Sequence, residues 1–271
     1  MKNKTRILSV AILVAACVAV LGQRENVREA KPGEVPFVYN ASDYGKVEIE
    51  SVLKSVAQPG DIPTEAPAHS CFHLEDKRPL PALEKGPRYF YPAYSTICII
   101  PLTDSSVTNH AKSYPYIHEA ATKLRKLLAK RPAKINAAKD INDVPLNNAS
   151  PAIQSKVQYL SFKTGTGVLF RTQYSQDIAP SPVNNEELTA NFQGLTTDGK
   201  YYVAARFAIT HPSLPKGIDY TNVPNREMDK TRSYLKKDER LLNSFAEESF
   251  RPSLTSLKSL IASITPTKDG N

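Results

Sequence analysis

Alternating hydrophobic and polar residues predict two β-hairpins in the middle of the chain. Residues 157–163 and 168–174 are strand-like, and the four residues between them include two glycines, which is typical of a hairpin turn. Residues 189–195 and 200–209 form a second such pair around Asp198-Gly199. In residues 200–209 every second side chain is apolar, which is the period of a strand with one buried face.

Apolar residues at spacings of three, four and seven predict three helices. The first spans residues 113–131, where Ser113 can cap the helix and Pro132 follows its end. The second spans residues 229–250, and the third begins after Ser253, a favourable N-cap residue. One helix therefore precedes the hairpins along the chain, and two follow them.

These elements predict an α+β fold, in which one antiparallel β-sheet has helices packed on it. Residues 46–56 and 94–102 supply further strand-like segments. About 200 residues are enough for one hydrophobic core, so we predict a single α+β domain over residues 46–265. Residues 23–45 are polar, contain prolines and are predicted to form a tether, and residues 266–271 are predicted to be a tail.

Residues 1–22 have the layout of a secretory signal peptide. Lys2, Lys4 and Arg6 precede an apolar stretch that ends in small residues. The apolar run is shorter than the roughly 20 residues that a membrane-spanning helix needs. We therefore expect an extracytoplasmic protein that is secreted, periplasmic or held at the cell envelope.

The N-terminal segment does not decide whether the exported protein is lipidated, cleaved or left uncleaved. Val14-Ala15-Ala16-Cys17 resembles a bacterial lipobox, in which Cys17 is lipidated and becomes the new N-terminus. Val20-Leu21-Gly22 resembles an ordinary cleavage site before Gln23, and an uncleaved anchor is a third alternative. If Cys17 carries several acyl chains, the membrane anchor is stable.

Removal or lipidation of Cys17 leaves Cys71 and Cys98 as an even pair of cysteines. An oxidising compartment favours a disulfide between them. Two buried free thiols are the alternative, because cysteine is among the residues most often buried.

His69, Cys71 and His73 form the clearest candidate for a metal site. On a strand the three side chains would project to one side, and imidazole with thiolate suits copper or zinc. No spacing selects a fourth ligand among the remaining histidines. A cysteine in a disulfide cannot also be a thiolate ligand, so this hypothesis competes with the disulfide. No other cofactor is indicated.

Residues 194–201, GLTTDGKY, differ by one residue from the phosphate-binding pattern G-x-x-x-x-G-K-[ST]. Tyr201 replaces the hydroxyl residue that holds Mg²⁺, and a strand follows instead of the helix whose N-terminus binds phosphate. We therefore predict no nucleotide site. Asp198-Gly199 is predicted to be a hairpin turn, in which glycine supplies the positive φ.

The formal charge of +8 includes three signal-peptide cations, which leaves +5 on the mature chain. For an exported protein, this charge favours an anionic cell-envelope polymer or lipid headgroups over a nucleic-acid partner. Lys123, Arg125 and Lys126 lie off the apolar face of the predicted helix at residues 113–131. The preferred interpretation of these charges is a merely solvated surface, and another envelope protein is the other candidate partner.

The sequence nominates no catalytic residue. It contains neither G-x-S-x-G nor a catalytic-cysteine signature, and adjacent acidic pairs on a helix point in different directions. The leading hypothesis is a non-catalytic binding or structural module, which would present residues such as Tyr202 and Arg206 on the sheet. The alternatives are an extracytoplasmic hydrolase, with an acidic residue beside a histidine in a pocket, and the metal-binding protein described above.

Four motifs lie close together in the hairpin region: GTGVLFRTQY (165–174), NNEEL (184–188), FQGLTTDGKYYV (192–203) and HPSLP (211–215). They resemble a group of uncharacterised exported bacterial proteins. The resemblance covers residues 157–215 and implies export and a shared β-rich core. It implies no activity, cofactor or catalytic residue.

Overall fold

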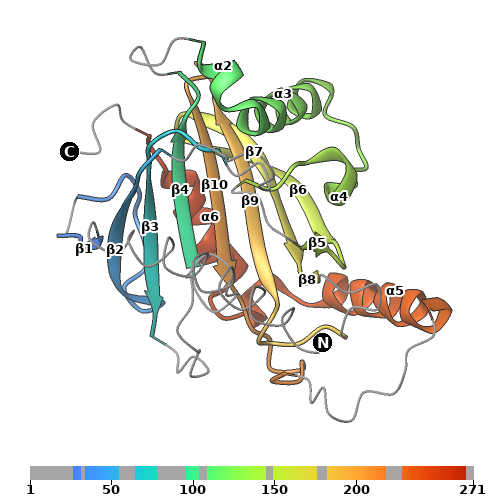
Figure 1. Cartoon of the computed structure of the whole chain (residues 1–271). Coiled ribbons are helices and arrows are strands. Elements are labelled where there is room, and N and C mark those ends of the chain that lie inside the picture. The colour runs from blue at the N-terminus through green and yellow to red at the C-terminus, as the bar shows by residue number, and fades with distance from the viewer. Residues whose placement is uncertain are drawn as a thin grey trace, which may run out of the picture.

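The structure is a computed structural model of the whole chain (Figure 1). It describes residues 27–31, 34–54, 65–77, 95–103, 109–144, 149–175, 182–217 and 228–266. Cys17, the predicted signal peptide at residues 1–22, and residues 267–271 lie outside these ranges. Among the described residues, no helix combines the length and apolar character that a membrane span requires.

The centre of the fold is an eight-stranded sheet in which every neighbouring pair is antiparallel. Its strands, in spatial order, are β1 (Val27–Glu29), β2 (Tyr44–Val52), β3 (His69–Asp76), β4 (Ser95–Pro101), β10 (Tyr201–Ala208), β9 (Thr189–Thr196), β7 (Gly165–Thr172) and β6 (Ser155–Phe162). The two short strands β5 (Ser150–Pro151) and β8 (Tyr174–Ser175) pair separately. Both predicted hairpins are present, as β6–β7 and β9–β10.

Helices accompany this sheet before and after the hairpins, which confirms the predicted α+β class. The described helices are α2 (His110–Ser113), α3 (Pro115–Lys130), α4 (Ala137–Asp140), α5 (Met228–Ser244) and α6 (Leu254–Ser263), with a 3-10 turn η4 (Glu247–Ser249). Three of the described helices precede the β6–β7 hairpin instead of the predicted one, but α2 and α4 are single turns. In Figure 1, α3 crosses one face of the sheet and α6 lies on the opposite face.

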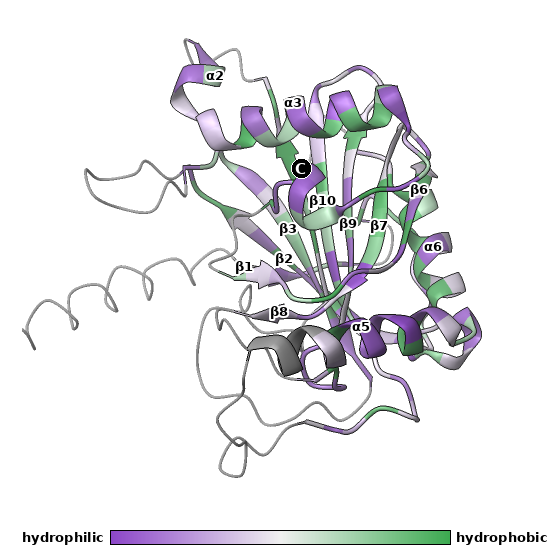
Figure 2. Cartoon of the chain, turned by 90° about the vertical axis from the view of Figure 1, so that its right-hand side faces the viewer, coloured by the Kyte–Doolittle hydropathy of each residue, from purple (hydrophilic) through white to green (hydrophobic). Residues whose placement is uncertain are grey.

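The sheet has a hydrophobic core on each face. Successive side chains of a strand point to opposite faces of the sheet and so enter different cores. Phe72 and Phe192 belong to the core beside α6, whereas Cys71 and Val168 belong to the core beside α3. In Figure 2, hydrophobic and hydrophilic residues alternate along α3, while α5 is largely hydrophilic. We call the two sides of the molecule the α3 face and the α6 face.

The helix α3 begins two residues later than its sequence pattern predicted. Pro115 occupies the first turn, where its missing N–H costs no hydrogen bond. Ser113 is not its cap: it ends the separate turn α2, which the side chain of Asn109 caps. The predicted apolar face is confirmed, since Ile117 and Leu124, with their helical neighbours, are buried against the sheet.

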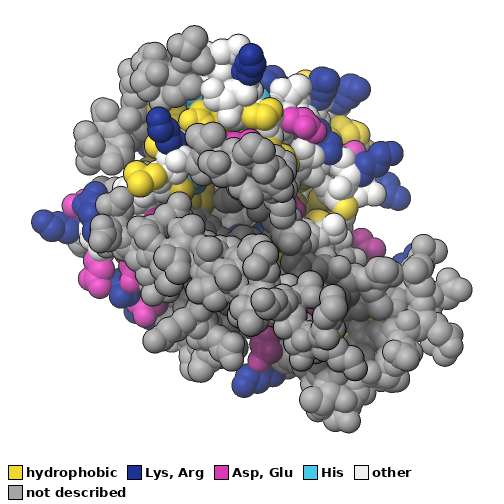
Figure 3. Space-filling model, viewed as in Figure 1, with side chains coloured by type: hydrophobic (Ala, Val, Ile, Leu, Met, Phe, Trp, Pro, Cys, Tyr) yellow, Lys and Arg dark blue, Asp and Glu magenta, His cyan; other side chains and the backbone are white. Residues whose placement is uncertain are grey.

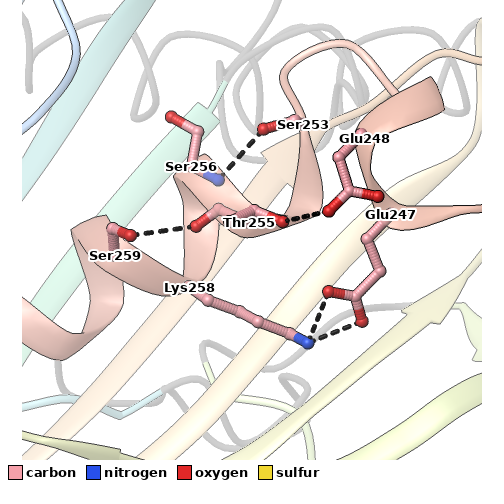
Figure 4. Close-up of polar contacts among 7 residues, drawn as sticks. All are labelled: Glu247, Glu248, Ser253, Thr255, Ser256, Lys258 and Ser259. Carbon is pink, nitrogen blue, oxygen red and sulfur yellow. Dashed lines mark hydrogen bonds and ion pairs between the residues drawn. The ribbon is translucent and has the colours of Figure 1, made fainter.

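The helix α6 begins as predicted. The Ser253 hydroxyl accepts a hydrogen bond of 3.0 Å from the backbone N–H of Ser256 (Figure 4). Leu254, Leu257 and Ile261 are buried beneath the sheet. This helix therefore closes the core of the α6 face.

Part of the range predicted as a tether belongs to the folded domain. Val27–Glu29 forms the edge strand β1, and Phe37 is buried in the core of the α6 face. The backbone N–H of Val38 donates to the Ser263 hydroxyl at 2.7 Å. The segment before β2 is therefore held against α6.

Glycines in the hairpins allow two aromatic rings to lie against the strands. A Cβ at Gly167 would stand 2.3 Å from the Gln193 carbonyl oxygen and 2.5 Å from the Phe192 ring. The Phe162 and Phe192 rings meet edge to face above these positions, with their centroids 5.9 Å apart. Part of the motif GTGVLFRTQY thus serves close packing.

Candidate functional site

Cys71 and Cys98 form a disulfide between the neighbouring strands β3 and β4. The two residues are directly opposite in the register, and both are buried on the α3 face. The pairing predicted from the cysteine count is therefore confirmed, in place of two free thiols.

The residues of the predicted metal site share one side of β3, as strand geometry requires. The nitrogen and sulfur atoms of His69, Cys71 and Cys98 lie within 4.8 Å of one another. However, the two sulfur atoms are joined, so neither is a thiolate while the disulfide is intact. His73 makes its contacts elsewhere, and metal binding by His69 and His73 stays a prediction.

A row of polar side chains crosses five strands on the α3 face. Each is the register partner of the next: Glu48 in β2, His73 in β3, Thr96 in β4, Arg206 in β10 and Asn191 in β9. His73, Thr96 and Asn191 are buried. We call these five residues the polar row. Polar atoms in such a position need hydrogen-bond partners.

At one end of the row, His73 joins an acid and a hydroxyl. Its Nε2 lies 2.7 Å from a carboxylate oxygen of Glu50, and its Nδ1 lies 3.2 Å from the Thr96 hydroxyl. Glu50 comes from the neighbouring position on the same face of β2. The order carboxylate, imidazole, hydroxyl is the order in which a general base activates a nucleophile.

At the other end, Arg206 contacts both a side-chain amide and an aromatic ring. Its Nε donates to the Asn191 side-chain oxygen at 3.3 Å, and its guanidinium carbon lies 4.6 Å from the centre of the Tyr174 ring. The Tyr174 hydroxyl donates to the Asp143 carboxylate at 2.9 Å. Arg206 is half-buried, so its charge lies at the boundary between the sheet and the solvent.

Three tyrosines surround Asp143, and we call these four residues the tyrosine cluster: Tyr116, Tyr174, Tyr202 and Asp143. The Tyr116 hydroxyl donates to the backbone carbonyl of Asp143 at 2.5 Å. Burial, followed by the charge of Asp143, raises the pKa of each tyrosine. The phenols therefore stay protonated at physiological pH.

Burial raises the pKa of Asp143 itself. The hydrogen bond from Tyr174 and the charge of Arg206 oppose this effect and lower the pKa. Asp143 is thus the local counter-charge of Arg206 and is already engaged by a phenol. This arrangement suits binding better than proton transfer.

Two buried polar atoms beside the cluster have no hydrogen-bond partner in the structure. They are the hydroxyl of Tyr202 and the side-chain oxygen of Gln193. The amide nitrogen of Gln193 donates to the backbone carbonyl of Val144 at 3.2 Å. In folded proteins such atoms are commonly satisfied by water or by a ligand. Tyr202 is fully buried and does not form an exposed binding surface, in contrast to the expectation from sequence.

The outer side of α3 and its neighbours is strongly basic. Residues 109–144 contain eight Lys and Arg residues and three Asp and Glu residues, a net charge of +5 that equals the charge of the mature chain. We call the exposed cations of this segment the basic face: Lys112, Arg125, Lys126, Lys130, Arg131, Lys134 and Lys139. Figure 3 shows Lys and Arg side chains gathered along this edge of the molecule.

The cations of the basic face lack acidic partners within 4 Å among the described residues, whereas several cations elsewhere, such as Arg28, have them. Lys46, for comparison, lies near Glu29 and Glu48, and Lys258 pairs with Glu247. The positive potential along α3 is therefore not compensated locally. Its charges are available to an anionic partner.

The motif NNEEL holds the motif HPSLP in place. The Asn185 side-chain amide donates to the carbonyls of His211 and Leu214 at 3.1 and 3.0 Å, and its oxygen accepts from the His211 N–H at 2.7 Å. The backbone N–H and the side-chain amide of Asn184 both donate to the side-chain oxygen of Gln173 in the first motif, at 3.2 and 3.4 Å. These motif residues therefore build the end of the sheet below β7 and β10.

The stretch GLTTDGKY is the turn of the β9–β10 hairpin, as predicted. Gly199 has φ of 70°, and the Asp198 carboxylate accepts from the Thr196 hydroxyl and the Lys200 N–H at 2.6 and 3.0 Å. The turn is followed by the strand β10, so no helix N-terminus is present there. A phosphate-binding loop is absent from this stretch.

Several residues of the candidate site were not nominated by the sequence. Thr96, Asn191 and Asp143 lie on separate elements, and only the strand register brings the first two into one row. The one sequence signal of Thr96 and Asn191 is that each is a polar residue at an inward position of a largely apolar strand. Comparison with known proteins adds no further guidance: no protein-family model, curated protein or solved structure matches the chain.

Proposed function

We propose that the protein is an exported binding module of the cell envelope that takes an anionic envelope polymer on its α3 face. The signal-peptide layout of residues 1–22 supports export, and either lipidation of Cys17 or release by cleavage places the domain outside the cytoplasm. The Cys71–Cys98 disulfide fits an oxidising compartment. The domain acts by binding, without catalysis.

The observation that carries this proposal is the uncompensated charge of the basic face. The net +5 of residues 109–144, which carry this face, equals the charge of the mature chain, so the remainder of the mature chain is neutral on balance. A polymer with regularly spaced negative groups gains from several such cations at once. The attraction is electrostatic and long-range, so it weakens with salt.

The polar row and the tyrosine cluster supply specificity on the same side of the sheet. Arg206 brings a positive charge to the boundary between sheet and solvent, where it attracts an acidic group, and the ring of Tyr174 lies against its guanidinium. In this proposal the basic face attracts the anionic polymer, and Arg206 recognises one of its acidic groups.

Binding to cell-wall fragments tests this proposal. The full-length protein is co-sedimented with bacterial wall fragments before and after removal of their anionic polymers. We expect binding to the intact fragments, and a loss on the order of 10- to 100-fold in a triple variant, Lys126→Gln, Lys130→Gln and Lys134→Gln.

The matched control neutralises three exposed lysines away from α3, namely Lys54→Gln, Lys236→Gln and Lys237→Gln. It has the same net charge as the triple variant and should bind like the wild type. Equal loss in both variants would show that total charge, not the basic face, governs binding. Preference for anionic lipid vesicles or for an envelope protein over wall fragments would contradict the polymer as ligand.

A second candidate function is hydrolysis, which the Glu50–His73–Thr96 arrangement favours. Thr96 would act as nucleophile, His73 as base and Glu50 as the group that orients the imidazole. Binding is the better-supported function, because Thr96 lies within a strand whose backbone N–H groups serve the sheet ladder. Such amides are not free to stabilise an oxyanion.

Covalent labelling decides between the two. A serine-hydrolase probe that modifies the wild type, but neither Thr96→Val nor His73→Gln, would establish the hydrolase. No labelling of folded wild-type protein, together with binding to wall fragments, is the result that we expect.

A further inference from the structure

Arg171 is a buried cation on the face of the sheet opposite the basic face. It lies in β7 between Ser155 of β6 and Ala190 of β9, and 1% of its surface is exposed. Burial lowers the pKa of its guanidinium to about 10, which leaves it protonated at neutral pH. Its Nε and both Nη atoms are buried and have no hydrogen-bond partner in the structure.

The nearest groups around Arg171 leave its N–H donors without an acceptor. The guanidinium carbon lies 5.0 Å from the centre of the Phe250 ring, which attracts the cation but accepts no conventional hydrogen bond. The charge of Glu247 acts on Arg171 and raises its pKa. However, both oxygens of Glu247 accept from the Lys258 ammonium, at 2.6 and 2.7 Å (Figure 4).

His211 is also committed to other partners. Its Nδ1 accepts from the Ser213 N–H at 3.1 Å, so the ring proton is on Nε2, which lies 2.9 Å from the Ser249 hydroxyl. Burial and then the charge of Arg171 lower the pKa of His211, which keeps the imidazole neutral. The Ser249 hydroxyl donates to the carbonyl of Ala246 at 2.6 Å. Neither side chain compensates the charge of Arg171.

A buried charge without a counter-ion consumes a large part of a domain's net stability. The guanidinium presents its donors as a planar fork that matches a planar oxyanion. We propose that Arg171 forms the base of a buried anion site, between β7 and the segment from α5 to α6, which takes one small carboxylate. This site is independent of the function proposed for the α3 face.

Two coplanar N–H···O bonds to one carboxylate satisfy the Arg171 fork, and the ring of Phe250 remains against one face of the guanidinium. The Ser155 hydroxyl donates to the Asn243 side-chain oxygen at 3.0 Å, so it offers no further donor to the ligand. Formate is the simplest probe of this chemistry.

Thermal unfolding of the full chain with added formate tests the proposal, with chloride at equal ionic strength as reference. At about 100 times the dissociation constant of formate, we expect the wild-type Tm to rise by roughly 5–10 °C above the chloride reference. The rise should be absent in Arg171→Met and retained in Arg240→Met, which removes an exposed arginine of α5.

If Arg171→Met does not fold, the wild type still decides the question. The Arg171 Nε–H resonance, assigned through its own side-chain carbons, should shift saturably with formate. An unchanged resonance, or equal Tm changes in formate and chloride, would overturn the anion site. The site would also be overturned if the Glu247→Gln substitution removed the compensating charge of Arg171 alone. Glu247 would then be the counter-ion of Arg171 in solution.

Discussion

The Cys71–Cys98 disulfide allows the most quantitative prediction. The two cysteines are 27 residues apart in sequence and directly opposite in the sheet. Because the strands already hold them together in the folded state, the bridge acts mainly on the unfolded chain. Closing a loop of this length removes entropy worth about 3.5 kcal/mol at 25 °C in the chain-entropy account. Loss of the bridge should lower Tm by roughly 7–14 °C.

Urea unfolding with and without reductant measures this effect, in a Cys17→Ser background that leaves two cysteines. Reduction keeps both buried sulfur atoms, so it isolates the bridge from any change in core volume. We expect the reductant to lower the free energy of unfolding of this protein by about 3.5 kcal/mol. The Cys71→Ala, Cys98→Ala variant should not respond to reductant. Two freely alkylated thiols in the unreduced protein, or an unchanged unfolding midpoint on reduction, would refute the reasoning.

Three further predictions concern packing, loop contacts and pH. Gly167→Ala should lose about 1–3 kcal/mol by urea unfolding, because its Cβ meets backbone and ring atoms, whereas Gly45→Ala, with no contact closer than 3.7 Å, should change stability by less than about 0.5 kcal/mol. Asn185→Ala removes three hydrogen bonds to the HPSLP segment and should cost about 2–3 kcal/mol by the same assay; wild-type stability would show that water replaces them. The pKa of His211 is lowered in the folded state, so the unfolded chain takes up its proton first and stability falls as pH drops below about 6.5. Between pH 7 and 5, His211→Gln should therefore lose less stability than the wild type, and parallel pH curves would contradict the lowered pKa.

Several elements of the fold were predictable because each of them has a local signal in the sequence. The strand period from Tyr201 to Ala208 and the Ser253 cap depend on residues close together in sequence. The strand β3 lacked such a signal. Its residues Cys71 to Leu74 are all buried, so no polar and apolar alternation marks a strand between two covered faces.

The candidate site was predictable only in part. The basic residues of α3 follow from helical spacing, and the disulfide follows from the cysteine count. The polar row depends on the order β2-β3-β4-β10-β9, in which β10 lies beside β4 although about 100 residues separate them in sequence. Arg171 had no sequence signal, because an arginine in a strand is ordinarily solvated.

The salt dependence of binding to the anionic wall polymer tests the central claim most directly. For the wild type, log Kd should rise linearly with log salt concentration, because each cation of the basic face that contacts the polymer releases counter-ions. The Lys126, Lys130 and Lys134 triple variant should show a shallower slope, and the Lys54, Lys236 and Lys237 control should keep the wild-type slope. A salt-independent Kd, or the same slope in all three proteins, would contradict the assignment of the basic face to an anionic polymer.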